Sequence, residues 1–319
     1  MIDFRYHLVS IIAVFLALTV GIVVGTTALN GGIVDTLRAS NTKVIRDKRS
    51  LETSVNQLRS QLSRRDDFAT AVAPRTVAGR LTGQRVLFVS TPGASDDTVA
   101  ALEALVSKAG GKPTGLLRLQ GDLLDPAKSQ VIDDVVASVA PAGLDLPTAG
   151  DPGNRAAVEL AAAVTAKKGL AADAAAKIVG GFTGADLVAV SAAPGGGASD
   201  VLQSATMAVL VTPGGDGTPP DQIGKQRQRA VLAVARALDN RSAGVVVTGP
   251  SSAAETGGLL AAVRADSGLS SQVSSVDSVE ASYAQIAVVL ALAEQATGNA
   301  GRYGQGPGSQ AAVPTSPPS

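Results

Sequence analysis

The sequence predicts an α/β protein that is anchored in a membrane by one N-terminal helix. Three observations support this fold class: an uncharged apolar run opens the chain, a seven-residue hydrophobic repeat follows it, and short β-rich runs then alternate with Ala-rich helical segments. The length of 319 residues allows one α/β domain with an appended element. We expect a transmembrane anchor at 1–30, a coiled-coil stalk at 31–70, an α/β domain at 77–298 and a tail at 299–319.

The anchor is the apolar run from Leu8 to Leu29, which contains no charged residue. At about 1.5 Å per residue, a helix of this length spans a hydrocarbon core of about 30 Å. Thr26 and Ala28 loosely resemble the cleavage site of a signal peptide, which is the competing interpretation. The run is longer than most signal-peptide cores and a helical pattern follows it, so we expect it to be retained as an anchor.

The residues of this helix do not decide its orientation in the membrane or whether it pairs with a second helix. Basic residues after the run favour a cytoplasmic location for the rest of the chain, but large domains cross membranes largely regardless of charge. Charge counting therefore does not decide the orientation. Gly21 and Gly25 form a small-xxx-small pair through which two membrane helices could approach closely, although single glycines are common in such helices.

The stalk is predicted from a heptad repeat that continues to about Arg65. The positions between the repeats are polar, as the surface of a coiled coil requires, so two chains could pair along this seam and form a homodimer. Polar residues within the seam would weaken the pairing but define its register. The stalk seam comprises eight positions: Leu37, Asn41, Val44, Lys48, Leu51, Val55, Leu58 and Leu62.

The same spacing also permits a second arrangement, in which the helix folds back onto its own α/β domain. The sequence favours self-association over this alternative without deciding between them. We expect Asp66, Asp67 and Pro74 to end the pattern and to mark the domain boundary.

The globular domain is predicted from runs that alternate between strand and helix character. Several strand runs are continuously apolar, as strands buried on both faces must be, which indicates a mostly parallel sheet covered by helices. A last apolar helix is expected to seal the core. The expected strands are 85–90, 114–119, 185–191, 207–212 and 244–249, and the expected helices are 97–109, 129–140, 154–168, 222–239, 253–266 and 283–295.

The loops after these strands carry no known ligand-binding fingerprint. The first turn, at 91–93, lacks both GxGxxG and the ending of a P-loop, and Asp96 and Asp97 place negative charge where a phosphate would sit. The glycine-rich loops at 193–197 and 213–217 are typical of flexible turns. The layering is therefore Rossmann-like without a dinucleotide fingerprint, and no cofactor is expected.

Catalytic arrangements are equally weak, so we do not expect an enzyme. The single histidine, His7, lies at the membrane edge, which excludes a Ser-His-Asp triad within the domain. Asp133 and Asp134 are adjacent on an expected helix, where their side chains diverge. The net charge is zero and no basic stripe with interleaved aromatic residues occurs, so nucleic-acid binding is not expected. The tail at 299–319 is rich in Gly, Pro and Ser and is expected to be disordered.

Several blocks resemble the actinobacterial copper transporter family of the MctB type, which has a SteB branch. They are the opening block at 1–29, the stalk, the strand and turn at 85–93, and the closing block at 289–304. The resemblance implies a cell-envelope protein with a cytoplasmic N-terminus and an extracytoplasmic domain, acting in copper efflux or homeostasis. The SteB branch instead implies a partner of a division protein that controls peptidoglycan hydrolysis.

The residues themselves do not predict a copper site. Cu(I) prefers thiolate and thioether ligands, but the chain has no Cys and only two Met residues, Met1 and Met207. Cu(II) prefers imidazoles, and only one is present. The short apolar strands are also unlike the alternating strands, of about ten residues each, that build a membrane β-barrel. Two hypotheses therefore remain: a copper-homeostasis protein with an indirect role, and a dimeric envelope scaffold that binds another protein.

Overall fold

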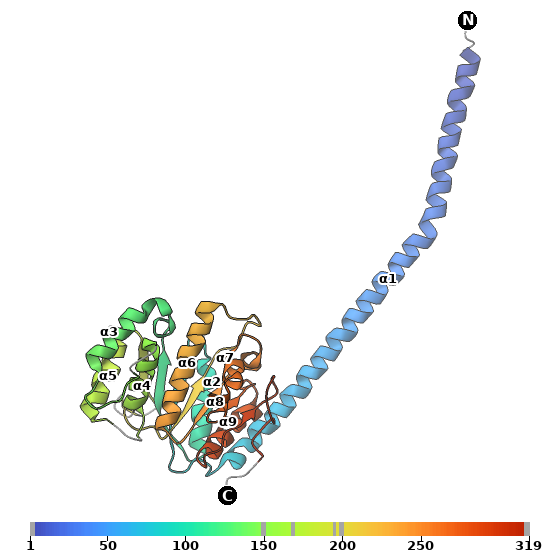
Figure 1. Cartoon of the computed structure of the whole chain (residues 1–319). Coiled ribbons are helices and arrows are strands. Elements are labelled where there is room, and N and C mark those ends of the chain that lie inside the picture. Colours follow the sequence, from blue (N-terminus) through green and yellow to red (C-terminus); the bar gives the residue numbers. More distant parts are fainter. Residues whose placement is uncertain (1–3, 148–150, 167–169, 194–195, 198–200, 316–319) are drawn as a thin grey trace. The chain divides into compact units, whose positions relative to one another are not determined.

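The computed structural model describes residues 4–147, 151–166, 170–193, 196–197 and 201–315 (Figure 1). The chain divides into two compact units, Met1–Arg65 and Asp66–Ser319. The division falls at Asp66, one of the residues that the sequence predicts as the domain boundary, and lies before residue 77, where the α/β domain is expected to begin. We describe each unit by itself.

The predicted anchor and stalk belong to one continuous helix, α1, which runs from Phe4 to Val77. Pro74 does not end this helix, contrary to expectation, because it lies inside the last turn. Ala73 and Val77, on either side of that proline, are buried in the core of the second unit. Tertiary burial thus holds the final turn in place where the local sequence favours a break.

The second unit is built on a seven-stranded sheet with the order β3-β2-β1-β4-β5-β6-β7. All neighbouring strands are parallel except β2 and β3, which are antiparallel. The predicted α/β class with a mostly parallel sheet is therefore confirmed. The strands are β1 Arg85–Ser90, β2 Lys112–Leu119, β3 Val188–Ala192, β4 Met207–Val211, β5 Val245–Thr248, β6 Ser274–Val276 and β7 Arg302–Tyr303.

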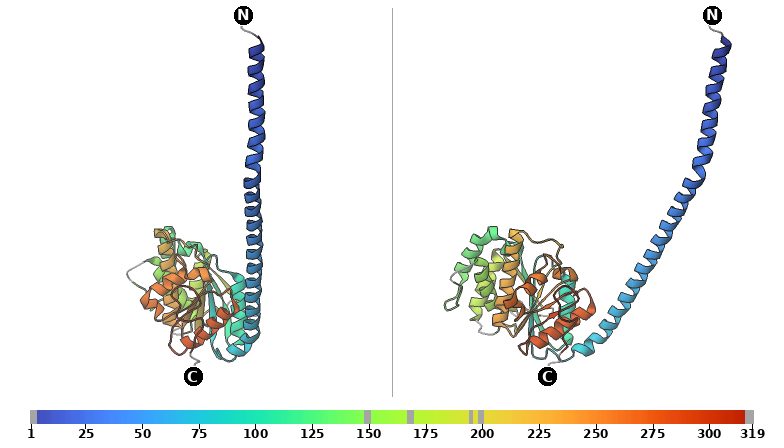
Figure 2. Two further views of the ribbon diagram at one scale, coloured as in Figure 1. Left: turned by 90° about the vertical axis from the view of Figure 1, so that its right-hand side faces the viewer. Right: turned by 45° about the vertical axis from the view of Figure 1, so that its right-hand side comes forward.

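Helices cover both faces of this sheet (Figure 2). Successive side chains of a strand point to opposite faces, so Leu87 and Val89 join one apolar core while Val86 and Phe88 join the other. The helices are α2 Asp96–Lys108, α3 Ser129–Val139, α4 Pro152–Val164, α5 Ala172–Gly184, α6 Gln222–Arg241, α7 Leu259–Ala265, α8 Ser267–Ser270 and α9 Ser282–Gln295, with 3₁₀ turns η1 Gly121–Leu124, η2 Pro126–Lys128 and η4 Ser251–Ala254.

α3, α4, α5 and α6 contribute to the first of these cores, and α2 and α9 contribute to the second. α9 confirms the predicted last helix that seals the core, because nine of its 14 residues are buried and none is fully exposed.

Three expected elements differ from the structure by more than two residues at one end or by a break. The helix expected at 154–168 ends at Val164, and residues 167 and 168 of that stretch lie outside the described residues. The helix expected at 253–266 is split into η4 and α7, because Gly257 between them has a left-handed φ of 84°. The strand expected from 185 begins only at Val188, because the chain turns between α5 and β3, with a left-handed φ of 54° at Asp186.

The expectation of a disordered tail from 299 is wrong for the described part of it. Residues 302–303 form β7, which extends the sheet beside β6, and Tyr303 is buried. The Gln310 backbone N–H donates to the Arg302 carbonyl oxygen at 2.7 Å, which turns the chain back on itself. We call residues 302–310 the C-terminal strap.

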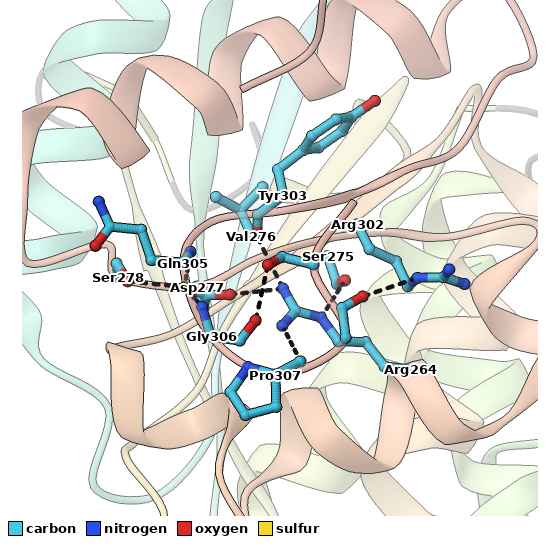
Figure 3. A network of polar contacts seen from close by, with 12 residues as sticks. Arg264, Ser275, Val276, Asp277, Ser278, Arg302, Tyr303, Gln305, Gly306 and Pro307 are labelled. Carbon is cyan, nitrogen blue, oxygen red and sulfur yellow. Dashed lines mark hydrogen bonds and ion pairs between the residues drawn. The ribbon is translucent and has the colours of Figure 1, made fainter. Parts of the chain in front are cut away.

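A buried ion pair holds this strap against the sheet (Figure 3). The Arg264 guanidinium lies 2.8 Å from Asp277 and also donates to the carbonyl oxygens of Tyr303 and Pro307, each at 2.7 Å. Asp277 in turn accepts the backbone N–H groups of Gln305 and Gly306. The composition of the tail alone does not predict these contacts, because they are made with residues that lie outside the tail in the sequence.

Candidate functional site

One described helical segment is long and apolar enough to cross a membrane. It spans Phe4–Thr27 and has a mean hydropathy of 2.8. Its threonine hydroxyl groups are satisfied within the helix: Thr19 donates to the Phe15 carbonyl oxygen at 2.6 Å, and Thr27 donates to that of Val23 at 2.7 Å. A hydrocarbon environment requires such internal partners, because it offers none of its own. This segment matches the predicted anchor.

The predicted small-residue pair lies on this segment. A Cβ added at Gly21 or at Gly25 would meet no atom within 4 Å outside the local helix. The two glycines therefore form an open notch on the helix surface in the single chain. Whether a second helix occupies this notch stays a prediction.

The stalk seam residues share one property, which is exposure in the single chain. The apolar members expose between 44% of the side chain, at Val55, and 66%, at Leu51. Lys48 forms an ion pair with Glu52 at 3.6 Å, one turn away, and both side chains remain well exposed. A regular apolar row of this kind favours burial against a partner, because leaving it in water costs roughly 25 cal/mol per Å².

Copper ligands are not brought together in the described part of the chain. Met207 is fully buried within β4, and His7 lies in α1 at the start of the anchor. Among the described residues, no three or more His, Cys, Asp or Glu side chains are grouped so that they could hold a metal ion. The residues present do not fit a resident copper centre, because the soft and imidazole donors that copper prefers are separate.

The adjacent acidic pairs that the sequence singled out have cationic or amide partners. Asp96 forms an ion pair with Arg118 at 2.8 Å, and Asp133 forms one with Arg155. Asp134 accepts a hydrogen bond from the Gln130 side chain at 2.9 Å. Asp133 and Asp134 thus direct their carboxylates to different partners, as expected for neighbours on a helix.

A cleft that sequence reasoning missed lies where the strand order reverses. The chain leaves β1 toward β2 and leaves β4 toward β5, although β1 and β4 are neighbours. The turns at 91–93 and 213–217, which showed no fingerprint, both contribute residues to a cavity of about 440 Å³ at this point. We call it the switch-point cleft. Only the strand order brings these two turns together, so no local pattern could have identified it.

Glu159 is a buried carboxyl group that belongs neither to the stalk seam nor to the switch-point cleft. Glu159 on α4 is fully buried, and both of its side-chain oxygens lack a hydrogen-bond partner. Burial raises its pKa to about 7, although the charge of Arg155 opposes the shift. Asp277 shows the opposite balance: burial would raise its pKa, but hydrogen bonds from Ser278, Gln305 and Arg264 outweigh burial and lower it.

Comparison with known proteins places these features in context. A family model described as "Copper transport outer membrane protein, MctB" matches residues 1–314. The protein named "Copper transporter MctB" in Mycobacterium tuberculosis is 32% identical over 321 residues, which cover 97% of this chain and 98% of the relative. The protein of the same name in Mycobacterium leprae is 30% identical over 324 residues, with the same coverage of both chains.

Proposed function

The chain belongs to the MctB family of copper transport proteins, and from this premise we propose that it acts in copper homeostasis indirectly, as a membrane-anchored dimer. In this proposal the stalk seam pairs two chains, and each chain presents one α/β domain outside the cytoplasmic membrane. The dimer influences copper handling through a protein partner in the cell envelope.

The observation that carries the indirect role is the donor set of the chain. Cu(I) is held by thiolates and thioethers, but the sequence has no Cys and its second Met is enclosed in the sheet. The family is named for the transport of copper. A protein that bound the ion directly would need at least two ligand atoms that converge on it. The binding of a partner needs none.

The observation that supports a dimeric platform is the exposed stalk seam. Its leucines and valines repeat every seven residues along α1, and each is at least 44% exposed in the single chain. Pairing two such seams would bury these side chains and place two identical domains together. A bivalent arrangement gains avidity for a repeated partner without any catalytic residue.

A copper-binding measurement on the purified full chain tests the indirect role. We expect no copper to remain after dialysis against a weak chelator, because soft ligands do not converge. The matched variant Met207→Leu should behave as the parent does, since that thioether is enclosed in β4. Stoichiometric copper that survives dialysis in both proteins would show that the donor argument is wrong.

The resemblance to the SteB branch implies a second candidate function, a dimeric scaffold for a partner in cell division and peptidoglycan hydrolase control, and the exposed seam is consistent with such a dimer. A deletion strain separates the two. Loss of growth in elevated copper with normal cell separation favours copper homeostasis, whereas chained cells with unchanged copper tolerance favour the division role. Complementation by a Leu51→Asp, Leu58→Asp double variant then tells whether either phenotype depends on the seam.

A further inference from the structure

The switch-point cleft has the position and size of a small-molecule site. Parallel α/β sheets bind ligands outside the carboxyl ends of their strands where the strand order reverses, which is the place of this cleft. Its volume of about 440 Å³ falls within the range of known ligand pockets, which is roughly 300 to 1,000 Å³. Thr91 and Pro92 after β1, with Pro213 and Gly214 after β4, line it from the two central strands.

Residues of opposite charge line the cleft. Arg227 and Gln228 come from α6, and Asp122 and Asp125 come from the segment that contains η1 and η2. Arg227 lies 4.0 Å from Asp125, which is the outer limit of an ion pair, and its side chain is 54% exposed. The other oxygen of Asp125 accepts the backbone N–H of Ala127 at 3.0 Å, so the carboxylate is fixed in place.

The contact between Arg227 and Asp125 is long and partly solvated, so it is weak and both groups can engage a ligand. The Gln228 amide donates to the Gly257 carbonyl oxygen at 2.7 Å, which ties α6 to the loop before α7. Asp122 has its own cation, Lys128, at 3.3 Å, so it does not compete for Arg227. The guanidinium therefore keeps donor groups that a ligand carboxylate could engage in a bidentate manner.

Glycine backbone forms much of the remaining lining. A Cβ at Gly214 would lie 2.2 Å from the Ser252 hydroxyl, and one at Gly258 would lie 2.1 Å from the Ala253 carbonyl oxygen. Side chains are thus excluded at these positions and the main chain faces the cleft. Apolar surface completes the lining, contributed by Leu124, Val231 and Leu259.

We propose that the switch-point cleft binds a small zwitterion, a molecule with one carboxylate and one ammonium group attached to an apolar body. The carboxylate pairs with Arg227, the ammonium pairs with Asp125 or Asp122, and the apolar body lies on the leucine and valine surface. A ligand with only a negative charge would be repelled by the two aspartates, and one with only a positive charge would be repelled by Arg227. Only a ligand with both charges complements the carboxylates and the guanidinium together. A free amino acid and the ends of a short peptide share this chemistry.

The test measures ligand-induced shifts in the thermal unfolding of the full chain in detergent, followed by calorimetric titration. Five probes of similar shape separate the charges: leucine, the dipeptide alanylleucine, 4-methylpentanoate with only the anion, 3-methylbutylamine with only the cation, and N-acetylleucinamide with neither. We expect leucine or the dipeptide to bind roughly tenfold more tightly than the two probes with one charge and roughly a hundredfold more tightly than N-acetylleucinamide, because each charged contact is worth about a factor of ten. The better of the two zwitterions identifies the source as a free amino acid or a peptide.

Two variants with matched controls locate the binding in the cleft. Arg227→Met removes the guanidinium, and its control Arg229→Met changes an exposed arginine of the same helix that does not line the cleft. Gly121→Leu places a side chain at the cleft lining, where an added Cβ would meet no atom within 4 Å, and Gly180→Leu makes the same change on the exposed surface of α5. We expect the first member of each pair to lose binding and the control to keep it.

Other outcomes overturn the proposal. If 4-methylpentanoate binds as tightly as leucine, the site recognises an anion and not a zwitterion. Binding that survives both Arg227→Met and Gly121→Leu would place the ligand elsewhere, and no binding by any probe would leave the cleft without the proposed role. None of these results bears on the copper function, which rests on the stalk and the donor set.

Discussion

At the scale of single residues, the most unusual group is Glu159. A carboxyl group that is fully buried without a hydrogen-bond partner is costly to ionise, so the protonated form is favoured in the folded chain. Its raised pKa has a consequence for stability, because the folded state then binds a proton more tightly than the unfolded state does.

We predict that the folded chain loses stability as pH rises through the range that this residue titrates. The contribution is fully present below the ordinary pKa of 4.5 and is lost as pH rises through about 7, at a cost of roughly 3 kcal/mol for a shift of this size. Denaturant midpoints of the detergent-solubilised chain at pH 5 and pH 8 measure it. Glu159→Gln should remove most of the difference, because the amide cannot ionise.

Exposed Glu255 provides the control for this experiment. Glu255→Gln should leave the difference between pH 5 and pH 8 as it is in the parent. If Glu159→Gln keeps the same difference as the parent, another group is responsible for the pH dependence.

Arg264 is the residue on which the C-terminal strap depends. Its side chain is 5% exposed and Asp277 is fully enclosed, so removal of the cation leaves a buried carboxylate without its counter-charge. Loss of one partner of a buried pair costs about 3 to 5 kcal/mol. We predict that Arg264→Met releases the strap and exposes the peptide bond after Arg302 to trypsin.

Mass spectrometry of timed digests measures cleavage at that bond. Arg236→Met is the matched control, because the Arg236–Asp266 pair at 2.9 Å is largely solvated and such pairs contribute about 0 to 1 kcal/mol. Equal cleavage in both variants would mean that the ion pair does not hold the strap.

At the scale of elements, α1 combines the predicted anchor and the predicted stalk in one helix. Its last turns also contact α9, which no sequence pattern indicated. Its last turns belong to the globular unit, where Asp66 accepts the backbone N–H of Ser282 at 2.6 Å. Ser282 is the first residue of α9, whose N-cap has no side-chain hydrogen bond of its own. Asp66 therefore caps a helix that lies more than two hundred positions away in the sequence.

If the stalk seam pairs two chains, a cysteine placed in it should crosslink to its own copy. In a parallel pair, Leu51→Cys would meet its own copy across the dimer axis and should crosslink under oxidation in membranes. Glu52→Cys is the matched control on the neighbouring surface and should crosslink less. The chain has no native Cys, so each band on a non-reducing gel reports the introduced thiol alone.

A double variant tests the same seam by disruption. Leu51→Asp with Leu58→Asp should separate the chains, because like charges buried at the seam are neither hydrated nor paired. If both cysteine variants crosslink equally poorly and the parent chain is monomeric at high concentration, the stalk does not dimerise. The alternative of a helix that folds back onto its own domain would then be favoured.

At the scale of the whole molecule, the proposed orientation leads to a test of topology. The chain has one described segment that can cross a membrane, so its two ends would lie on opposite sides. We predict that a reporter enzyme active only in the cytoplasm is silent when fused after Ser319, and active when fused before Met1. Fusion at the C-terminus preserves β7, which a fusion point before the strap would remove. Strong activity of the C-terminal fusion would reverse the orientation.

The sequence by itself determined the features that arise from local periodicity. The apolar run before Thr27, the seven-residue repeat along α1 and the continuous apolar strands such as β1 and β4 are all local patterns, and their positions were predicted closely. Hydrophobic spacing is a property of neighbouring residues, so it can be recognised without knowing the fold.

Only the tertiary structure decided the features that depend on distant partners. β6 is Ser-Ser-Val and β7 is Arg-Tyr, and neither is long or apolar enough to indicate a strand. They form because β5 offers an edge and because Arg264 and Asp277 satisfy the strap's polar groups. The switch-point cleft likewise follows from the strand order, since burial and hydrogen bonding between segments far apart in the sequence decide which loops meet.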